Sequence, residues 1–67
     1  MKRLTFYGMH MHHLENENID KFLLDIKDVC KKHNLSISHE DGQGAFEIKT
    51  YNESLMDWLM AAHDLTK

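Results

Sequence analysis

The sequence predicts a small α+β domain whose elements follow the order β-α-β-β-α. Residues 35–39 and 46–50 alternate apolar and polar side chains, which is the pattern of half-buried strands. Residues 18–33 and 53–63 instead repeat apolar side chains at helical spacing. With 67 residues, the chain has room for a single domain, 1–67, with a small core. We therefore expect a homo-oligomer whose copies share apolar surface.

The first strand is expected at residues 2–7, which alternate as a strand does and end at Gly8. The next segment, Met9–His13, has no clean period of either kind. It is predicted either to extend the first strand or to form an ordered loop.

The strongest helix pattern covers residues 18–33. Its apolar side chains are predicted to form one buried stripe, made of Ile19, Phe22, Leu23, Ile26, Val29 and Cys30. Asn16 or Asn18 can cap the helix by accepting a backbone N–H, and Asn34 can end it in the left-handed conformation. Cys30 is interpreted as a core residue rather than a nucleophile. Because it is the single cysteine, no disulfide can form within the chain.

Residues 35–39 and 46–50 are predicted to pair as a β-hairpin. In its turn, Gly42 and Gly44 are free to take positive φ, and Asp41 is expected to accept backbone N–H groups. The core side of the hairpin is predicted to carry Leu35, Ile37 and His39. The solvent side is predicted to carry Ser36 and Ser38.

The three strands are predicted to form one short, mainly antiparallel sheet in the order 1-3-2. A right-handed crossover would make the first strand parallel to the second, with the third strand between them. Asn52 is expected to cap the second helix. Both helices would cover one face of the sheet, and the other face would be exposed or covered by a second copy.

Composition narrows the range of partners. The net charge of −3 leaves no basic patch for phosphates, so nucleic acid is not an expected partner. No apolar run is long enough to span a membrane and no signal peptide is recognised, so cytoplasm is the expected location. No motif indicates a cofactor.

The most distinctive candidate site is His39-Glu40-Asp41 at the hairpin tip. A carboxylate beside an imidazole can act as a general acid–base pair or bind a metal ion, but no nucleophile accompanies it. The alternatives are a structural rim histidine above a turn, or a contact for a partner protein. Trp58 with Tyr51 and Met60 could add an aromatic patch. The predicted partner-binding residues are His39, Glu40, Asp41, Gln43, Tyr51 and Trp58.

Histidines also gather in the Met9–His13 segment. His10 and His12 would share one face if the segment were a strand, a spacing that suits a first-row metal ion with a third ligand from elsewhere. His13 and His39 are further candidates. The alternative is an exposed polar segment with incidental metal affinity, because no established metal motif is present.

The stretch from Leu35 to Phe46 resembles a motif in small proteins of phages and prophages of Gram-positive bacteria. The shared motif reads Ser-Ile-Ser-His-Glu-Asp-x-x-Gly-Ala-Phe. The preceding Lys-Lys-His-Asn at 31–34 also matches, as do the later Trp-Leu and Ala-His pairs at 58–59 and 62–63. The resemblance implies a phage-encoded accessory protein acting in the cytoplasm of a bacterial host. No catalytic residues can be carried over from the resemblance.

We therefore expect a non-enzymatic protein that binds a host or phage protein, for example to inhibit a host factor or a defence system. One alternative is a small metal- or ligand-binding protein that uses His10, His12, His13 or His39. The other is a self-assembling structural protein.

Overall fold

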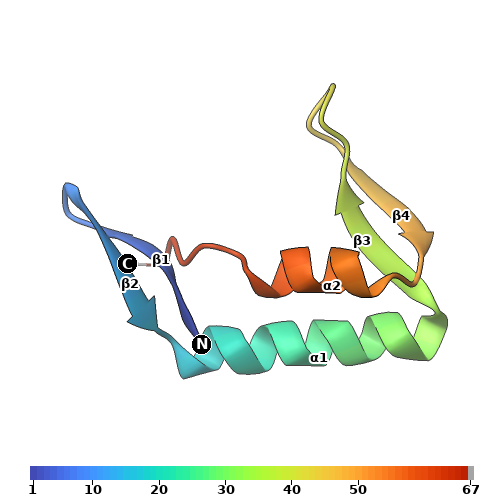
Figure 1. Ribbon diagram of the computed structural model, residues 1–67, viewed down its shortest axis with the longest axis horizontal. Helices are drawn as coiled ribbons and strands as arrows, with labels where there is room; N and C mark the ends of the chain where they lie inside the picture. Colours follow the sequence, from blue (N-terminus) through green and yellow to red (C-terminus); the bar gives the residue numbers. More distant parts are fainter. Residues whose placement is uncertain (67) are drawn as a thin grey trace.

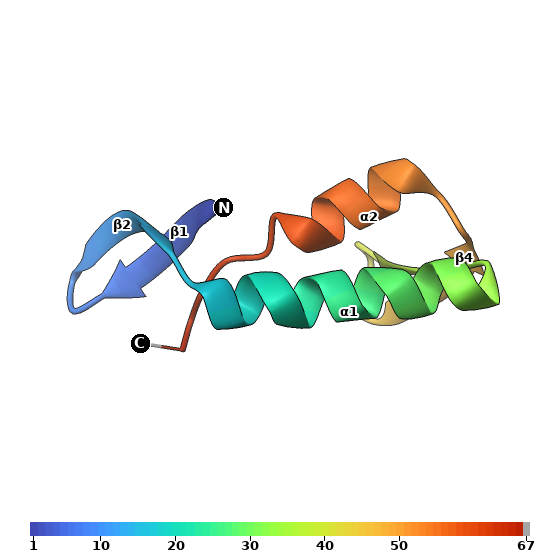
Figure 2. The same ribbon diagram turned by 90° about the horizontal axis from the view of Figure 1, so that it is seen from below.

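The computed structural model describes residues 1–66, which form two helices and two β-hairpins (Figure 1). The elements are β1 (Lys2–Tyr7), β2 (His10–Glu15), α1 (Glu17–His33), β3 (Leu35–His39), β4 (Phe46–Thr50) and α2 (Glu53–Met60). The two helices lie side by side, with one hairpin at each end of α1 (Figures 1 and 2). The α+β class is confirmed.

The strands form two separate antiparallel sheets, β1-β2 and β3-β4, so the predicted single sheet of order 1-3-2 is wrong. The predicted sheet does not form because residues 10–13 of the Met9–His13 segment belong to an additional strand, β2. Gly8 takes φ 62° at the first position of a two-residue loop, which turns the chain straight back. β1 therefore pairs with its neighbour in sequence, with Tyr7 opposite His10 and Lys2 opposite Glu15.

α1 ends at the predicted residue, His33, and begins at Glu17, one residue before the predicted start. The Asn16 side chain, rather than that of Asn18, caps the helix by accepting a hydrogen bond from the Ile19 N–H at 3.2 Å. Asn34 ends it at φ 55°, and its N–H donates to the carbonyls of Cys30 and Lys31.

Only part of the predicted stripe of α1 is buried. Leu23 and Cys30 are buried, but Phe22 and Val29 are exposed. On a helical wheel these two residues lie at one edge of the stripe, and nothing in the described chain covers that edge. Among the described residues, the buried apolar side chains are Leu23 and Cys30 of α1 and Met56 of α2.

The side of the β3-β4 hairpin that faces inward is the opposite of the predicted one. Ser36 and Ser38 are buried, whereas Leu35 is 45% exposed. β3 packs against both helices, and the small serines allow this close approach. The Ser36 hydroxyl also accepts a hydrogen bond from the Asn52 N–H at 2.7 Å. A strand with period-two alternation can bury either side, and here it buries the polar one.

α2 starts at the predicted cap and ends early. The Asn52 side chain accepts hydrogen bonds from the N–H groups of Ser54 and Leu55. The helix ends at Met60 rather than at residue 63, because the chain leaves it to run along β1. There the Asp64 N–H donates to the Leu4 carbonyl at 2.8 Å.

Candidate functional site

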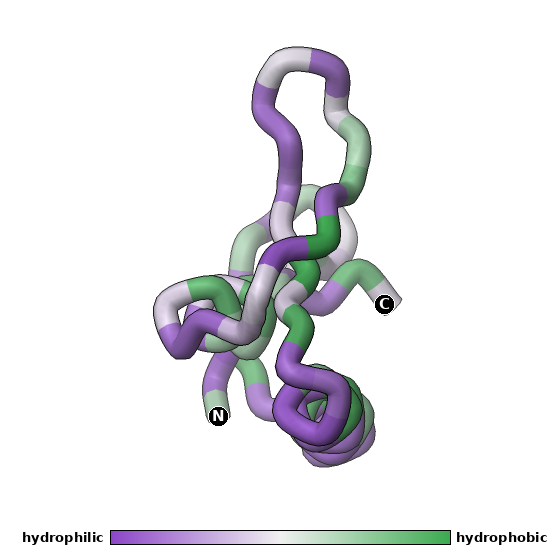
Figure 3. Tube along the Cα trace, turned by 90° about the vertical axis from the view of Figure 1, so that its right-hand side faces the viewer, coloured by the Kyte–Doolittle hydropathy of each residue, from purple (hydrophilic) through white to green (hydrophobic). Residues whose placement is uncertain are grey.

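One side of the β3-β4 hairpin is apolar, and we call it the outer face: Leu35, Phe46 and Ile48 are exposed there, and Ile37 is half-buried. Their positions in the register place them on one side, with Ile37 opposite Ile48 and His39 opposite Phe46. Phe46 is 75% exposed and Ile48 is 64% exposed. Hydrophobic and hydrophilic residues alternate along this hairpin in Figure 3. A cluster of exposed apolar side chains of this kind is typical of a protein-binding surface.

The outer face continues onto α1 through a shallow groove of about 220 Å³. Val29 and His33 line the groove on the helix side, and Leu35, Ile37 and Ile48 line it on the hairpin side. The exposed edge of the helical stripe and the outer face therefore form one continuous apolar surface.

The hairpin tip is organised by Glu40 rather than by Asp41. The Glu40 carboxylate accepts hydrogen bonds from the N–H groups of Gly42 at 2.6 Å and Gln43 at 2.5 Å. Asp41 was predicted to fill this role, but its side chain is fully exposed. Of the two glycines, only Gly44 takes positive φ, at 73°. The tip thus projects the Asp41 carboxylate into solvent, where it lies beside the exposed His39 ring.

His39 connects the tip to the outer face. Its ring meets that of Phe46 edge to face, with centroids 6.1 Å apart. Its Nδ1 lies 3.4 Å from Asp41 Oδ1 in an exposed position. This separation is long for a hydrogen bond, and both groups face water. His39 therefore lies at the edge of the outer face, next to the tip.

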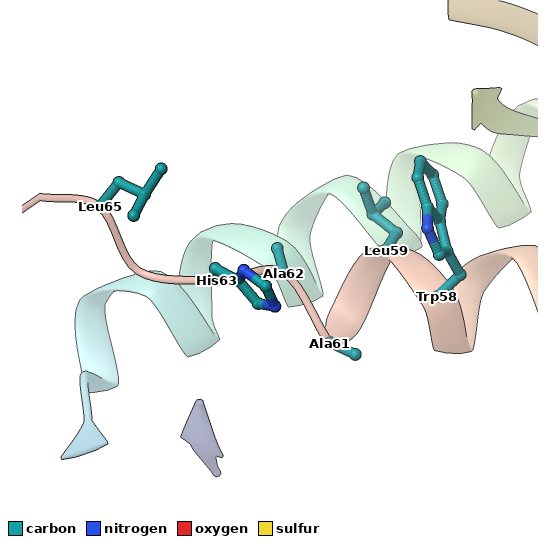
Figure 4. A pocket seen from close by; sticks show the side chains of 6 residues that line it. All are labelled: Trp58, Leu59, Ala61, Ala62, His63 and Leu65. Carbon is teal, nitrogen blue, oxygen red and sulfur yellow. The ribbon is translucent and has the colours of Figure 1, made fainter. Parts of the chain in front are cut away.

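Tyr51 and Trp58 lie apart from the tip, so the six predicted partner-binding residues do not form one surface. The Tyr51 hydroxyl donates a hydrogen bond to Glu53 Oε1 at 2.5 Å, which raises the pKa of Tyr51 to about 12. Trp58 projects from α2 beside Leu59 (Figure 4). It lines a shallow hollow of about 470 Å³ that extends to His63 and Leu65.

The histidines of β2 are partly arranged as predicted. His10 and His12 share one side of the strand, with ring centroids 6.3 Å apart. His13 points to the other side, and His39 belongs to the hairpin at the opposite end of α1. Residues 1–66 contain no group of three or more metal-binding side chains arranged to hold an ion.

The residues that sequence reasoning missed are those of the outer face, because Leu35 and Ile37 were assigned to the core. The available signal was that serines occupy both alternate positions, 36 and 38. Such small side chains fit under a closely packed helix as easily as they face water.

No family model, curated protein or solved structure matches the chain. Within residues 1–66, neither helix has the length and apolar character to cross a membrane.

Proposed function

We propose that this chain is a non-enzymatic protein-binding domain that docks another protein on the outer face and the adjoining tip. The observation that carries the proposal is the exposure of Phe46 and Ile48 on a surface continuous with Val29 of α1. Apolar anchors at the centre of a surface with a polar rim are the usual arrangement of a protein interface.

The tip contributes the polar rim of this surface. Asp41 and the backbone of the turn stand beside His39 and Phe46, so a partner contacting the apolar anchors also meets a carboxylate. A basic side chain of the partner would complement Asp41. Trp58 and its hollow on α2 offer a second, separate contact.

The resemblance of residues 35–46 to small phage proteins supports a more specific proposal. The partner is then a host or phage protein met in the cytoplasm of an infected bacterium, and occupying its surface would inhibit a host factor or a defence component. A small domain with an exposed apolar surface can inhibit by occlusion, without any chemistry of its own.

Affinity capture from the lysate of a Gram-positive host tests the proposal. The baits are the wild type, a Phe46→Ser/Ile48→Ser double variant, and a Met9→Ser/Met11→Ser control that loses exposed apolar side chains in the first hairpin. Chelator is present throughout. One bacterial protein retained by the wild type and the control, and lost by the outer-face variant, is the expected result. Equal retention by all three folded baits would remove the outer face from the proposal.

A second candidate function, metal binding, rests on the shared side of His10 and His12. Zinc or nickel should then raise the melting temperature of the wild type by mass action, and a His10→Ala/His12→Ala variant should not respond. An unchanged wild-type melting curve at excess metal would contradict this candidate.

A further inference from the structure

We propose that the open edge of β4 pairs with the same edge of a second copy of this chain. The two copies are related by a two-fold axis through Ile48. The result is one antiparallel sheet in the order β3-β4-β4-β3. This pairing goes beyond the proposed function, because it uses backbone groups along the edge of the hairpin rather than side chains on its outer face.

The first argument is that the β4 edge is open. In an antiparallel pair, alternate residues direct their N–H and C=O groups at the partner strand. The Glu40 N–H donates to the Ala45 carbonyl, and the Tyr51 N–H donates to the Asn34 carbonyl. The odd-numbered residues of β4 therefore face β3.

The even-numbered residues, Phe46, Ile48 and Thr50, consequently direct their backbone groups away from β3. Within the described chain, β4 packs against no element other than β3. In contrast, the outer edge of β1 is covered where Thr5 pairs with Asp64. An uncovered edge is a template for pairing, and a sheet of only two strands gains stability from additional strands.

The second argument is that the edge is complementary to itself. A two-fold axis at Ile48 places Ile48 opposite the partner's Ile48, and Phe46 opposite the partner's Thr50. Each of these pairs brings two outward-facing backbones together and exchanges both N–H···O bonds. The same symmetry applies to both copies, as an isologous interface requires.

The charged residues of β4 select this register. With the axis at Ile48, Glu47 lies opposite the partner's Lys49, and Lys49 lies opposite the partner's Glu47. These are non-hydrogen-bonded pairs, whose side chains approach most closely. Within one chain the same two side chains already lie 3.7 Å apart, so the dimer would assemble four alternating charges.

The neighbouring registers are disfavoured by the same residues. Moving the axis to residue 47 places Glu47 opposite itself, and moving it to residue 49 places Lys49 opposite itself. Like charges directly opposite each other destabilise a strand pair. A two-fold axis that falls between two residues would place each even-numbered residue of one β4 opposite an odd-numbered residue of the other. The odd-numbered residues direct their N–H and C=O groups at β3, so the hydrogen bonds between the two β4 strands would be lost. Only the Ile48 register combines backbone pairing with opposite charges.

The dimer would also place two outer faces on one side of a four-stranded sheet. Residues that lie directly opposite each other on paired strands have their side chains on the same face of the sheet. Both copies of Phe46 and Ile48 would therefore lie on the same face. A partner protein would meet a doubled apolar surface. Loss of the dimer would nevertheless leave each outer face intact, so the two proposals can fail separately.

The test is the oligomeric state of purified protein, measured by light scattering over a dilution series. The wild type should be a dimer, and Glu47→Lys and Lys49→Glu should each dimerise at least about tenfold more weakly. Mixing these two variants should restore a one-to-one dimer, because every facing pair again has opposite charges. The doubly exchanged chain, Glu47→Lys/Lys49→Glu, should dimerise alone.

A matched control, Asp25→Lys, changes the net charge as Glu47→Lys does but lies on an exposed part of α1, and it should remain a dimer. Amide exchange provides an independent measurement: the N–H groups of Ile48 and Thr50 should be protected only in the dimer. A wild type that stays monomeric at every concentration would overturn the proposal. So would a dimer that neither single charge change weakens.

Discussion

Arg3 and Asp20 form an ion pair between β1 and α1, with 2.5 Å between Nη2 and Oδ1. The Arg3 side chain is completely buried, and its Nη1 also donates to the carbonyls of Met60 and Ala62. One side chain thus connects the first hairpin, the start of α1 and the segment after α2. The hydrogen bond from Arg3 is the main cause that holds the pKa of Asp20 below its ordinary value.

Asp20 should make folding stability depend on pH in the acid range. Because the folded-state pKa of Asp20 lies below its ordinary value of 3.8, its contribution is complete above that value. The contribution is lost as the pH falls through the lowered pKa. Urea unfolding of the wild type and Asp20→Asn should therefore differ most near neutral pH and converge below pH 3.8. A constant difference down to the lowest pH would contradict this role.

Tyr51 should ionise unusually late. Its hydrogen bond to Glu53 raises its pKa to about 12, and Glu53→Gln should bring the pKa back towards its ordinary value of 10.0. A raised folded-state pKa means that this stabilising contribution is lost as the pH rises from 10 towards 12. Phenolate absorbance in a Tyr7→Phe background isolates the Tyr51 signal. The prediction is wrong if Glu53→Gln leaves that titration unchanged.

The two glycines of the tip should respond differently to alanine. Gly44→Ala places a side chain at φ 73° and should cost about 1–2 kcal/mol of unfolding free energy. Gly42 does not need positive φ, but its added Cβ would lie 2.6 Å from Glu40 Oε1 and displace that carboxylate.

Gly42→Ala should therefore act mainly through Glu40. Its effect should disappear in a Glu40→Ala background, whereas the effect of Gly44→Ala should persist there. Thermal unfolding of the wild type, Glu40→Ala, the two glycine variants and the two double variants measures both differences. Equal losses for Gly42→Ala with and without Glu40 would contradict the assignment.

The orientation of the second hairpin can be tested by exchanging polarity on its two sides. Ser36→Val overfills a buried site and removes the acceptor of the Asn52 N–H, so it should cost about 1–3 kcal/mol. Phe46→Ser, at an exposed site, should cost less than about 1 kcal/mol. Denaturant unfolding gives both values. The opposite ranking would restore the orientation expected from sequence alone.

Local features of this fold could be predicted because they depend on neighbouring residues. Three helix ends are capped by an asparagine next to the helix in sequence: Asn16 and Asn52 accept backbone N–H groups at the helix starts, and Asn34 ends α1 in the left-handed conformation. The bounds of β3 and β4 follow from the alternation of apolar and polar residues. The tip was predicted less well. Both Glu40 and Asp41 can accept turn N–H groups, and only the shape of the loop decides between them.

Features that depend on distant residues could not be predicted. Whether β1 pairs with β4, as the predicted order requires, or with β2 depends on the turn at Gly8, which the irregular Met9–His13 pattern conceals. The side of β3 that faces inward depends on how closely both helices pack, and Ser36 is compatible with either side. The outer face, which is the basis of the proposed function, is therefore visible only in three dimensions.

The central claim is that the outer face contacts another protein, and site-specific photocrosslinking in bacterial cells tests it most directly. A photoreactive phenylalanine analogue would replace Phe46 on the outer face or, as a control, Tyr7 on the other hairpin, where the side chain is also exposed. The account predicts a crosslink to one bacterial or phage protein from position 46 and none from position 7. No heterologous crosslink from position 46, or the same product from both positions, would contradict it.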